Sequence, residues 1–201
     1  DGRIPALTAA ATAAGEVRRE SRRGAGPTPG PEYRGLWERC LTLGVPRLSG
    51  AYNNNFQLFQ AEDHVVILNE MIHDSRIIPL DGRPPVDPKI RQWLGNSRGR
   101  WDGDTLVVET ANFSDKTSFR GARENLQLTE RYTRVASDTL LYEVTVEDPS
   151  TFERPWTFVL PMTRNDGLVY EYACHEGNYG MVNLLRGARA EDAALAGAGA
   201  R

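Results

Sequence analysis

The chain has 201 residues, a formal net charge of -3 and 40% hydrophobic residues. That apolar content can bury one sizeable core, which excludes a disordered protein and favours a single domain. Lys and Arg are scattered without a basic stripe, which argues against nucleic acid as a partner. No apolar run approaches the roughly 20 residues that a membrane-spanning helix requires, so we expect no membrane span.

The two ends of the chain differ in composition from its middle. Residues 1–31 are rich in Ala, Gly, Pro and Arg, and we predict an N-terminal arm there. Within it, Leu7 to Arg23 can form a helix that ends at the Gly/Pro tract of residues 24–31, a typical linker. Residues 189–201 are Ala-rich without an apolar stripe and predict a loose tail or a short helix. The main domain is therefore predicted over residues 32–188.

Between these ends the apolar residues repeat with period two, which is typical of half-buried strands. Asp-Gly turn signals at 81–82, 102–103 and 166–167 separate several of the segments. Sequential strands joined mainly by short turns predict an all-β, mainly antiparallel fold: an up-and-down, lipocalin-like β-barrel of about eight strands, favoured over a two-sheet sandwich. The predicted strands cover residues 56–60, 65–73, 76–80, 106–113, 126–135, 140–146, 156–162 and 168–174.

Two segments outside the strands predict short peripheral helices. Pro88 to Gly95 has a proline start, an apolar i, i+3, i+4 set and a glycine stop. Gly180 to Arg189 is predicted to close the domain as a second helix. The connection from Ser114 to Asn125 is polar and carries three cations, so we predict a loop or lid.

The segment from Asn69 to Arg76 carries four ionisable side chains at the end of an otherwise apolar strand. Counting by twos places Asn69 and His73 on one face of that strand. One interpretation is a strand that leaves the core at a solvated turn. The other is a polar site at the mouth of a pocket, and the sequence leaves both open.

A second polar cluster follows the last predicted strand, where His175 and Glu176 precede a glycine. A histidine titrates near neutrality and can exchange protons beside a carboxylate. Alternatively, His175 hydrogen-bonds a neighbouring loop and does no chemistry. If both histidines met at one barrel mouth, the catalytic set would be His73, Asp74, His175 and Glu176; their spacing does not establish that they meet.

A third polar centre is predicted inside the barrel. Glu130 shares its parity with Leu128 and Tyr132, so it can point inward; the alternative is a cross-strand ion pair on the outer face. The predicted ligand-binding set joins this centre to polar and aromatic residues of the neighbouring strands: Asn69, Arg76, Glu130, Tyr132, Tyr142 and Tyr172.

Cys40 and Cys174 are the two cysteines of the chain. A disulfide between the N-terminal segment and the last strand is the favoured interpretation and indicates an oxidising compartment, with two buried thiols as the alternative. Zinc-ligand spacings, a P-loop, a dinucleotide fingerprint and a Gly-x-Ser-x-Gly elbow are all missing from the sequence. We therefore expect no cofactor and no metal site.

Four phrases of the sequence resemble a family of hypothetical proteins from soil and environmental bacteria. They run over residues 39–47, 73–84, 99–110 and 170–176, and the resemblance covers roughly residues 36–188. Members of that family carry secretion signals, so the resemblance implies a periplasmic or extracellular location and is consistent with the disulfide. It implies no activity, substrate or catalytic residue.

Three functional hypotheses follow from these observations. The leading one is a secreted barrel that binds a small organic ligand in its interior, with His73, Arg76, Tyr142 and His175 near the mouth. The second is a cofactor-independent lyase, isomerase or hydrolase that uses a His/carboxylate pair on the barrel rim. The third is a structural subunit of a secreted homo-oligomer that is joined through the Ala/Gly-rich ends.

Overall fold

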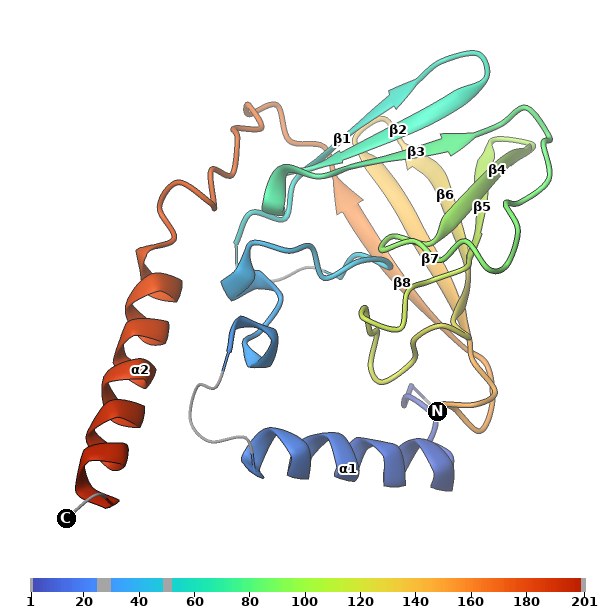
Figure 1. The fold of residues 1–201 in the computed structure, drawn as a ribbon. Coiled ribbons are helices and arrows are strands. Elements are labelled where there is room, and N and C mark those ends of the chain that lie inside the picture. The colour runs from blue at the N-terminus through green and yellow to red at the C-terminus, as the bar shows by residue number, and fades with distance from the viewer. Residues whose placement is uncertain (1, 25–29, 49–51, 200–201) are drawn as a thin grey trace.

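A computed structural model describes residues 2–24, 30–48 and 52–199, and its body consists of two antiparallel sheets (Figure 1). The first sheet contains β1 (Phe56–Gln60), β2 (His64–Asn69) and β3 (Ser75–Pro79). The second contains β4 (Asn96–Asp102), β5 (Thr105–Ala111), β6 (Gln127–Ala136), β7 (Thr139–Glu147) and β8 (Trp156–Thr163). Within each sheet, every strand pairs with its neighbours in sequence, so both sheets are meanders.

The predicted closed barrel is wrong, because the chain forms two sheets of three and five strands. Among the described residues, β1 pairs only with β2 and β8 only with β7, so an unpaired seam separates β1 from β8. The strand predicted over residues 168–174 would have continued the series, but this segment is irregular and leads away to the disulfide. At the other junction, the connection between β3 and β4 contains Pro84, Pro85 and Pro88, which lack the amide donors of a hairpin ladder.

Side chains join the two sheets where β3 approaches β4. Gly99 of β4 lies so close to β3 that a Cβ there would be 2.8 Å from Ile78 Cγ2 and 2.6 Å from Leu80 Cδ2. Arg76 of β3 also donates from Nε to Ser97 Oγ of β4 at 2.9 Å. The inward faces of both sheets therefore share one apolar core, which includes Val65, Ile67, Ile78, Leu106, Val108, Tyr142, Val144 and Val146.

Several elements differ between the prediction and the structure. β2 ends at Asn69, and a 3-10 turn, η3 (Met71–His73), follows with Ile72 and His73 at φ 64° and 54°. The helix predicted from Pro88 to Gly95 is absent; that segment contains two short turns and an isolated bridge from Gln92 to Phe113. β4 was missed because its sequence, with Gly and two arginines among seven residues, has no period-two apolar pattern.

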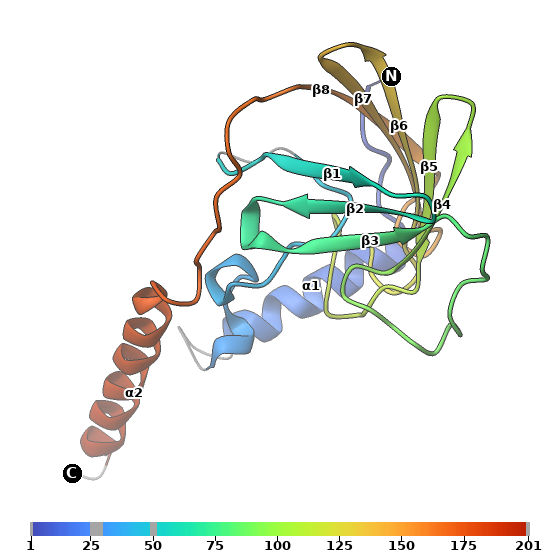
Figure 2. The ribbon, with the colours of Figure 1, turned by 90° about the horizontal axis from the view of Figure 1, so that it is seen from above.

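Two α-helices flank the sheets, and α2 (Tyr179–Gly199) projects away from them (Figures 1 and 2). It covers the predicted closing helix and most of the predicted tail. α1 (Ala9–Gly24) confirms the N-terminal helix, and Thr8 begins it by accepting a hydrogen bond from Ala11 N at 3.1 Å. The linker predicted after this helix falls mostly on residues 25–29, outside the described residues. Across the described part of the chain, no helix combines the length and the apolarity needed to cross a membrane.

The predicted disulfide is confirmed: Cys40 and Cys174 are bonded, with their Cα atoms 5.7 Å apart. Cys40 follows the 3-10 turns η1 (Pro31–Tyr33) and η2 (Trp37–Arg39), and Cys174 precedes α2. Asn178 strengthens the same junction by donating from Nδ2 to the Glu38 carbonyl at 2.8 Å. The segment before the sheets is thereby fixed to the segment after them.

Candidate functional site

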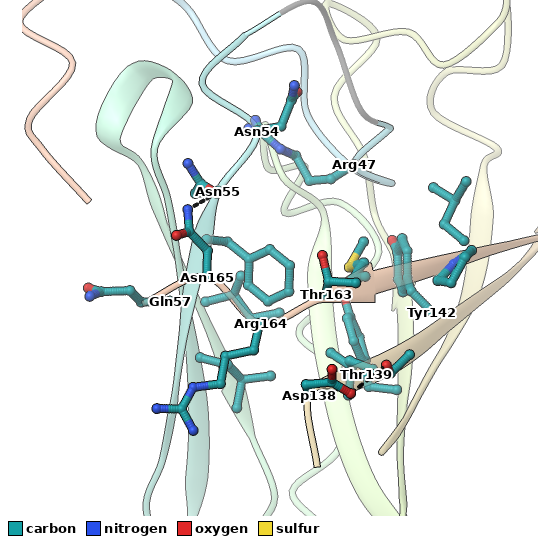
Figure 3. Close-up of a pocket in the computed structure, with 18 of the residues that line it drawn as sticks. Arg47, Asn54, Asn55, Gln57, Asp138, Thr139, Tyr142, Thr163, Arg164 and Asn165 are labelled. Atoms are coloured by element: carbon teal, nitrogen blue, oxygen red, sulfur yellow. Dashed lines mark hydrogen bonds between the residues drawn. The ribbon is translucent and has the colours of Figure 1, made fainter. Parts of the chain in front are cut away.

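A pocket of about 690 Å³ lies between the two sheets, and both strands of the unpaired seam, β1 and β8, contribute to its wall (Figure 3). The remaining wall comes from β2, β6 and β7 and from loop residues that include Arg47, Asn54 and Asn165. Inward side chains alternate along these strands, as in Leu160 of β8, which is half-buried between the exposed Val159 and Pro161. Most of the wall is apolar, with Phe56, Leu58, Ile67, Leu140, Leu160 and Met162 as its main members.

A buried ion pair lies beneath the pocket. Arg76 donates from Nη1 to Glu130 Oε1 at 3.0 Å and from Nη2 to Oε2 at 2.5 Å, and the two residues are 5% and 0% exposed. Arg76 also donates to Thr110 Oγ1 at 2.5 Å and to Ser97 Oγ at 2.9 Å. The pair and its hydrogen bonds therefore connect four strands: β3, β4, β5 and β6.

Two tyrosines connect this ion pair to the pocket wall. Tyr132 and Tyr142 both line the pocket and both donate to Glu130 Oε1, at 3.1 Å and 2.6 Å. Their rings stack with centroids 4.7 Å apart. The hydroxyl protons are thus committed to Glu130, so toward the pocket these phenols can offer only oxygen lone pairs as acceptors.

The charges of the pair are stabilised by each other. Burial alone would raise the pKa of Glu130, but attraction to Arg76 and the hydrogen bonds from Arg76, Tyr142 and Tyr132 outweigh it and lower the pKa. Burial raises the pKa of Tyr132 and Tyr142, and the Glu130 carboxylate raises both further. The floor of the pocket therefore consists of an ionised pair and two neutral phenols.

Polar side chains gather at the end of the pocket where β2 leaves its sheet. Asn69 is only 5% exposed and lines the pocket, yet its side-chain amide makes no hydrogen bond with any described residue. Arg47 lines the same pocket beside Asn54 (Figure 3). Its guanidinium likewise has no hydrogen bond or ion pair with the described residues. In the described part of the chain, the buried atoms that lack a partner do not include those of Arg47 or Asn69, so the donors of both side chains are accessible from the pocket and can bind a ligand there.

Asp74 lies close to this polar end. Both of its carboxylate oxygens are buried and have no hydrogen-bond partner among the described residues. Burial lowers the pKa of Arg47, and the attraction of Asp74 opposes that shift. Two asparagines brace the neighbouring rim: Asn165 donates to Asn55 Oδ1 at 3.1 Å, and Asn55 donates to Glu70 Oε2 at 2.8 Å.

The predicted catalytic residues lie outside this pocket. His73 is exposed in η3, and the exposed His175 and Glu176 lie in the turn before α2; none of them lines the pocket. Tyr172 lines a smaller pocket of about 310 Å³ beside the disulfide instead. No cluster of three or more potential metal-ligating side chains occurs in the described part of the chain. A catalytic role for the histidines stays a prediction.

Part of this site was predicted from the sequence. Of the predicted ligand-binding residues, Asn69, Tyr132 and Tyr142 line the pocket, while Arg76 and Glu130 lie beneath them. Arg47 was missed because it follows Pro46 in a segment without periodicity, and only long-range packing brings it to the pocket. The alternation of side chains along β1 and β8 was the sequence pattern that could have predicted the apolar wall.

Comparison with known proteins adds no assignment. No protein-family model matches the chain, and no curated protein or solved structure matches it.

Proposed function

We propose that this protein binds a small organic molecule in the pocket between its two sheets. The observation that carries the proposal is the combination of an apolar wall with two polar side chains, Arg47 and Asn69, that make no side-chain hydrogen bond with the described residues. Ligand pockets have volumes of about 300–1,000 Å³ and pair apolar walls with a few polar groups that orient the ligand. The volume of about 690 Å³ falls within that range.

The buried ion pair supports the same proposal. Arg76 and Glu130 hold β3 and β6 at a fixed separation, while the tyrosines present a rigid floor. A buried polar network whose hydrogen bonds are satisfied is rigid. Such a preorganised site loses little conformational entropy when a ligand enters.

We further propose that the protein works in the periplasm or outside the cell. The Cys40–Cys174 disulfide supports this location, because stable disulfides form in oxidising compartments. The homo-oligomeric alternative and the rim-enzyme alternative stay predictions, and neither is needed to account for the pocket.

The test is a titration with Nile red, an uncharged dye whose fluorescence rises in apolar surroundings. Wild-type protein is expected to bind it saturably. Leu160→Trp places an indole in the pocket and is expected to weaken binding at least tenfold. The matched control is Val159→Trp, the adjacent exposed position of β8, which leaves the pocket unchanged.

Unchanged circular dichroism and melting temperature would establish that both variants fold. If folded Leu160→Trp binds the dye as tightly as wild type, the pocket is not the binding site and the proposal fails.

A further inference from the structure

We propose that the pocket selects ligands that carry a carboxylate, and that Arg47 binds this group while the apolar body of the ligand lies against β1 and β8. This inference rests on the proposed function and adds to it the chemical class of the ligand. It also gives Arg47, which sequence patterns did not single out, the role of a specificity-determining residue.

The first step concerns the hydrogen-bonding capacity of Arg47. A guanidinium presents five N–H donors in a planar fork that matches a carboxylate. Arg47 is half-buried and lines the pocket, but none of its donors is used by a described residue. Burial lowers its pKa, which means that its charge is incompletely compensated where it lies. An anionic ligand supplies the missing partner.

The second step concerns Asp74, the competing partner. Asp74 attracts Arg47 electrostatically, yet no hydrogen bond or ion pair joins the two side chains. Asp74 is absent from the pocket wall, whereas Arg47 belongs to it. The carboxylate of Asp74 therefore attracts the guanidinium without using its donors, which stay available to the pocket.

The third step compares Arg47 with the other arginines of the wall. Arg134 donates from Nη2 to the Ser137 carbonyl at 2.6 Å, and Arg164 pairs with Asp166 at 2.8 Å. Both are exposed. Three arginines and one aspartate, Asp138, line the pocket. Arg47 is the member of this set whose donors are unengaged by described residues.

The fourth step adds a second donor. Asn69 lines the pocket, and its backbone N–H donates to the Asp74 carbonyl at 2.8 Å, which fixes it beside the residue that precedes β3. Its side-chain NH₂ is unengaged and can donate to the second carboxylate oxygen. Tyr142 cannot take this role, because its proton is directed to Glu130.

The experiment compares parinaric acid with its methyl ester, two fluorescent probes of the same shape that differ in charge. Wild-type protein is expected to bind the acid roughly tenfold more tightly than the ester. Arg47→Gln should weaken acid binding by about the same factor and leave ester binding unchanged, because it removes the charge and shortens the donor. Arg47→Lys should retain part of the preference.

The matched control is Arg134→Gln, which removes an equal charge from an arginine that already donates to backbone carbonyls. It should leave the preference for the acid in place. If it abolishes the preference as Arg47→Gln does, general electrostatics explains the selectivity and the role of Arg47 is wrong.

The two proposals fail separately. Ester binding that Leu160→Trp weakens, without any preference for the acid, would uphold the binding pocket and overturn the carboxylate inference. A preference that survives in folded Arg47→Gln would overturn it as well. If wild-type protein binds neither probe, both proposals are contradicted.

Discussion

Glu130 decides how the interior of this protein is held together. Its carboxylate is 0% exposed and accepts hydrogen bonds from Arg76, Tyr132 and Tyr142. Removing one partner of such a pair leaves the other charge buried alone, which typically costs about 3–5 kcal/mol. The sequence could predict that Glu130 points inward, because Glu130 and Leu128 lie two residues apart and therefore share one face of the strand. The identity of its partner did not follow, because Arg76 lies 54 residues away.

The first stability prediction concerns Glu130→Gln. We expect it to lower the free energy of unfolding at pH 7 by about 3 kcal/mol, since Arg76 loses its counter-charge. The folded-state pKa of Glu130 is lowered, so its contribution is present above the unfolded-state value of about 4.5 and is lost as pH falls through the folded-state pKa. In urea unfolding, the difference in free energy of unfolding between wild type and variant should therefore stay constant from pH 7 to about 5. This difference should become smaller below about pH 4.5.

The control for this prediction is Glu143→Gln. Glu143 is half-buried and lies on the face of β7 opposite to Tyr142. It should change stability by less than about 0.5 kcal/mol at pH 7. A gap between Glu130→Gln and wild type that stays unchanged into the acid range would contradict the assigned ionisation of Glu130.

At the scale of elements, the close approach of β3 and β4 positions the floor of the pocket. Local patterns predicted most strands, because alternation and Asp-Gly turns are encoded within a few residues. They missed β4, whose Gly99 and arginines are explained only by what lies across from them. They also extended β2 through His73, although the chain turns at Ile72 in a left-handed conformation that a β-branched residue rarely adopts.

The prediction for this junction is that Gly99→Ala destabilises the protein by about 1–3 kcal/mol, because its Cβ would lie within 2.8 Å of Ile78 and Leu80 side-chain atoms. Gly177→Ala is the control, since nothing lies within 4 Å of a Cβ there. Thermal or urea unfolding measures both. Equal stability of the two variants would mean that the sheets do not meet at Gly99 as described.

At the scale of the whole molecule, this fold differs from the predicted closed barrel at two places: the seam between β1 and β8, and the junction of β3 and β4, where the strands do not pair. Strand order is a local property of the meander, whereas closure depends on whether the first and last strands find each other. Here the chain after β8 is directed to Cys40, and side chains such as Asn165 and Asn55 span the seam instead of a backbone ladder. The seam borders the pocket. Local sequence patterns could not predict this seam, although the proposed function depends on it.

The most direct test of the central claim is methyl NMR of the wild-type protein during titration with parinaric acid. We predict saturable shifts for the methyl groups of Leu140, Leu160 and Met162, which line the pocket. The exposed Ile77 and Val159 lie outside it and should not shift. Shifts confined to such outer-face methyls, or no saturable shift at all, would contradict ligand binding between the sheets.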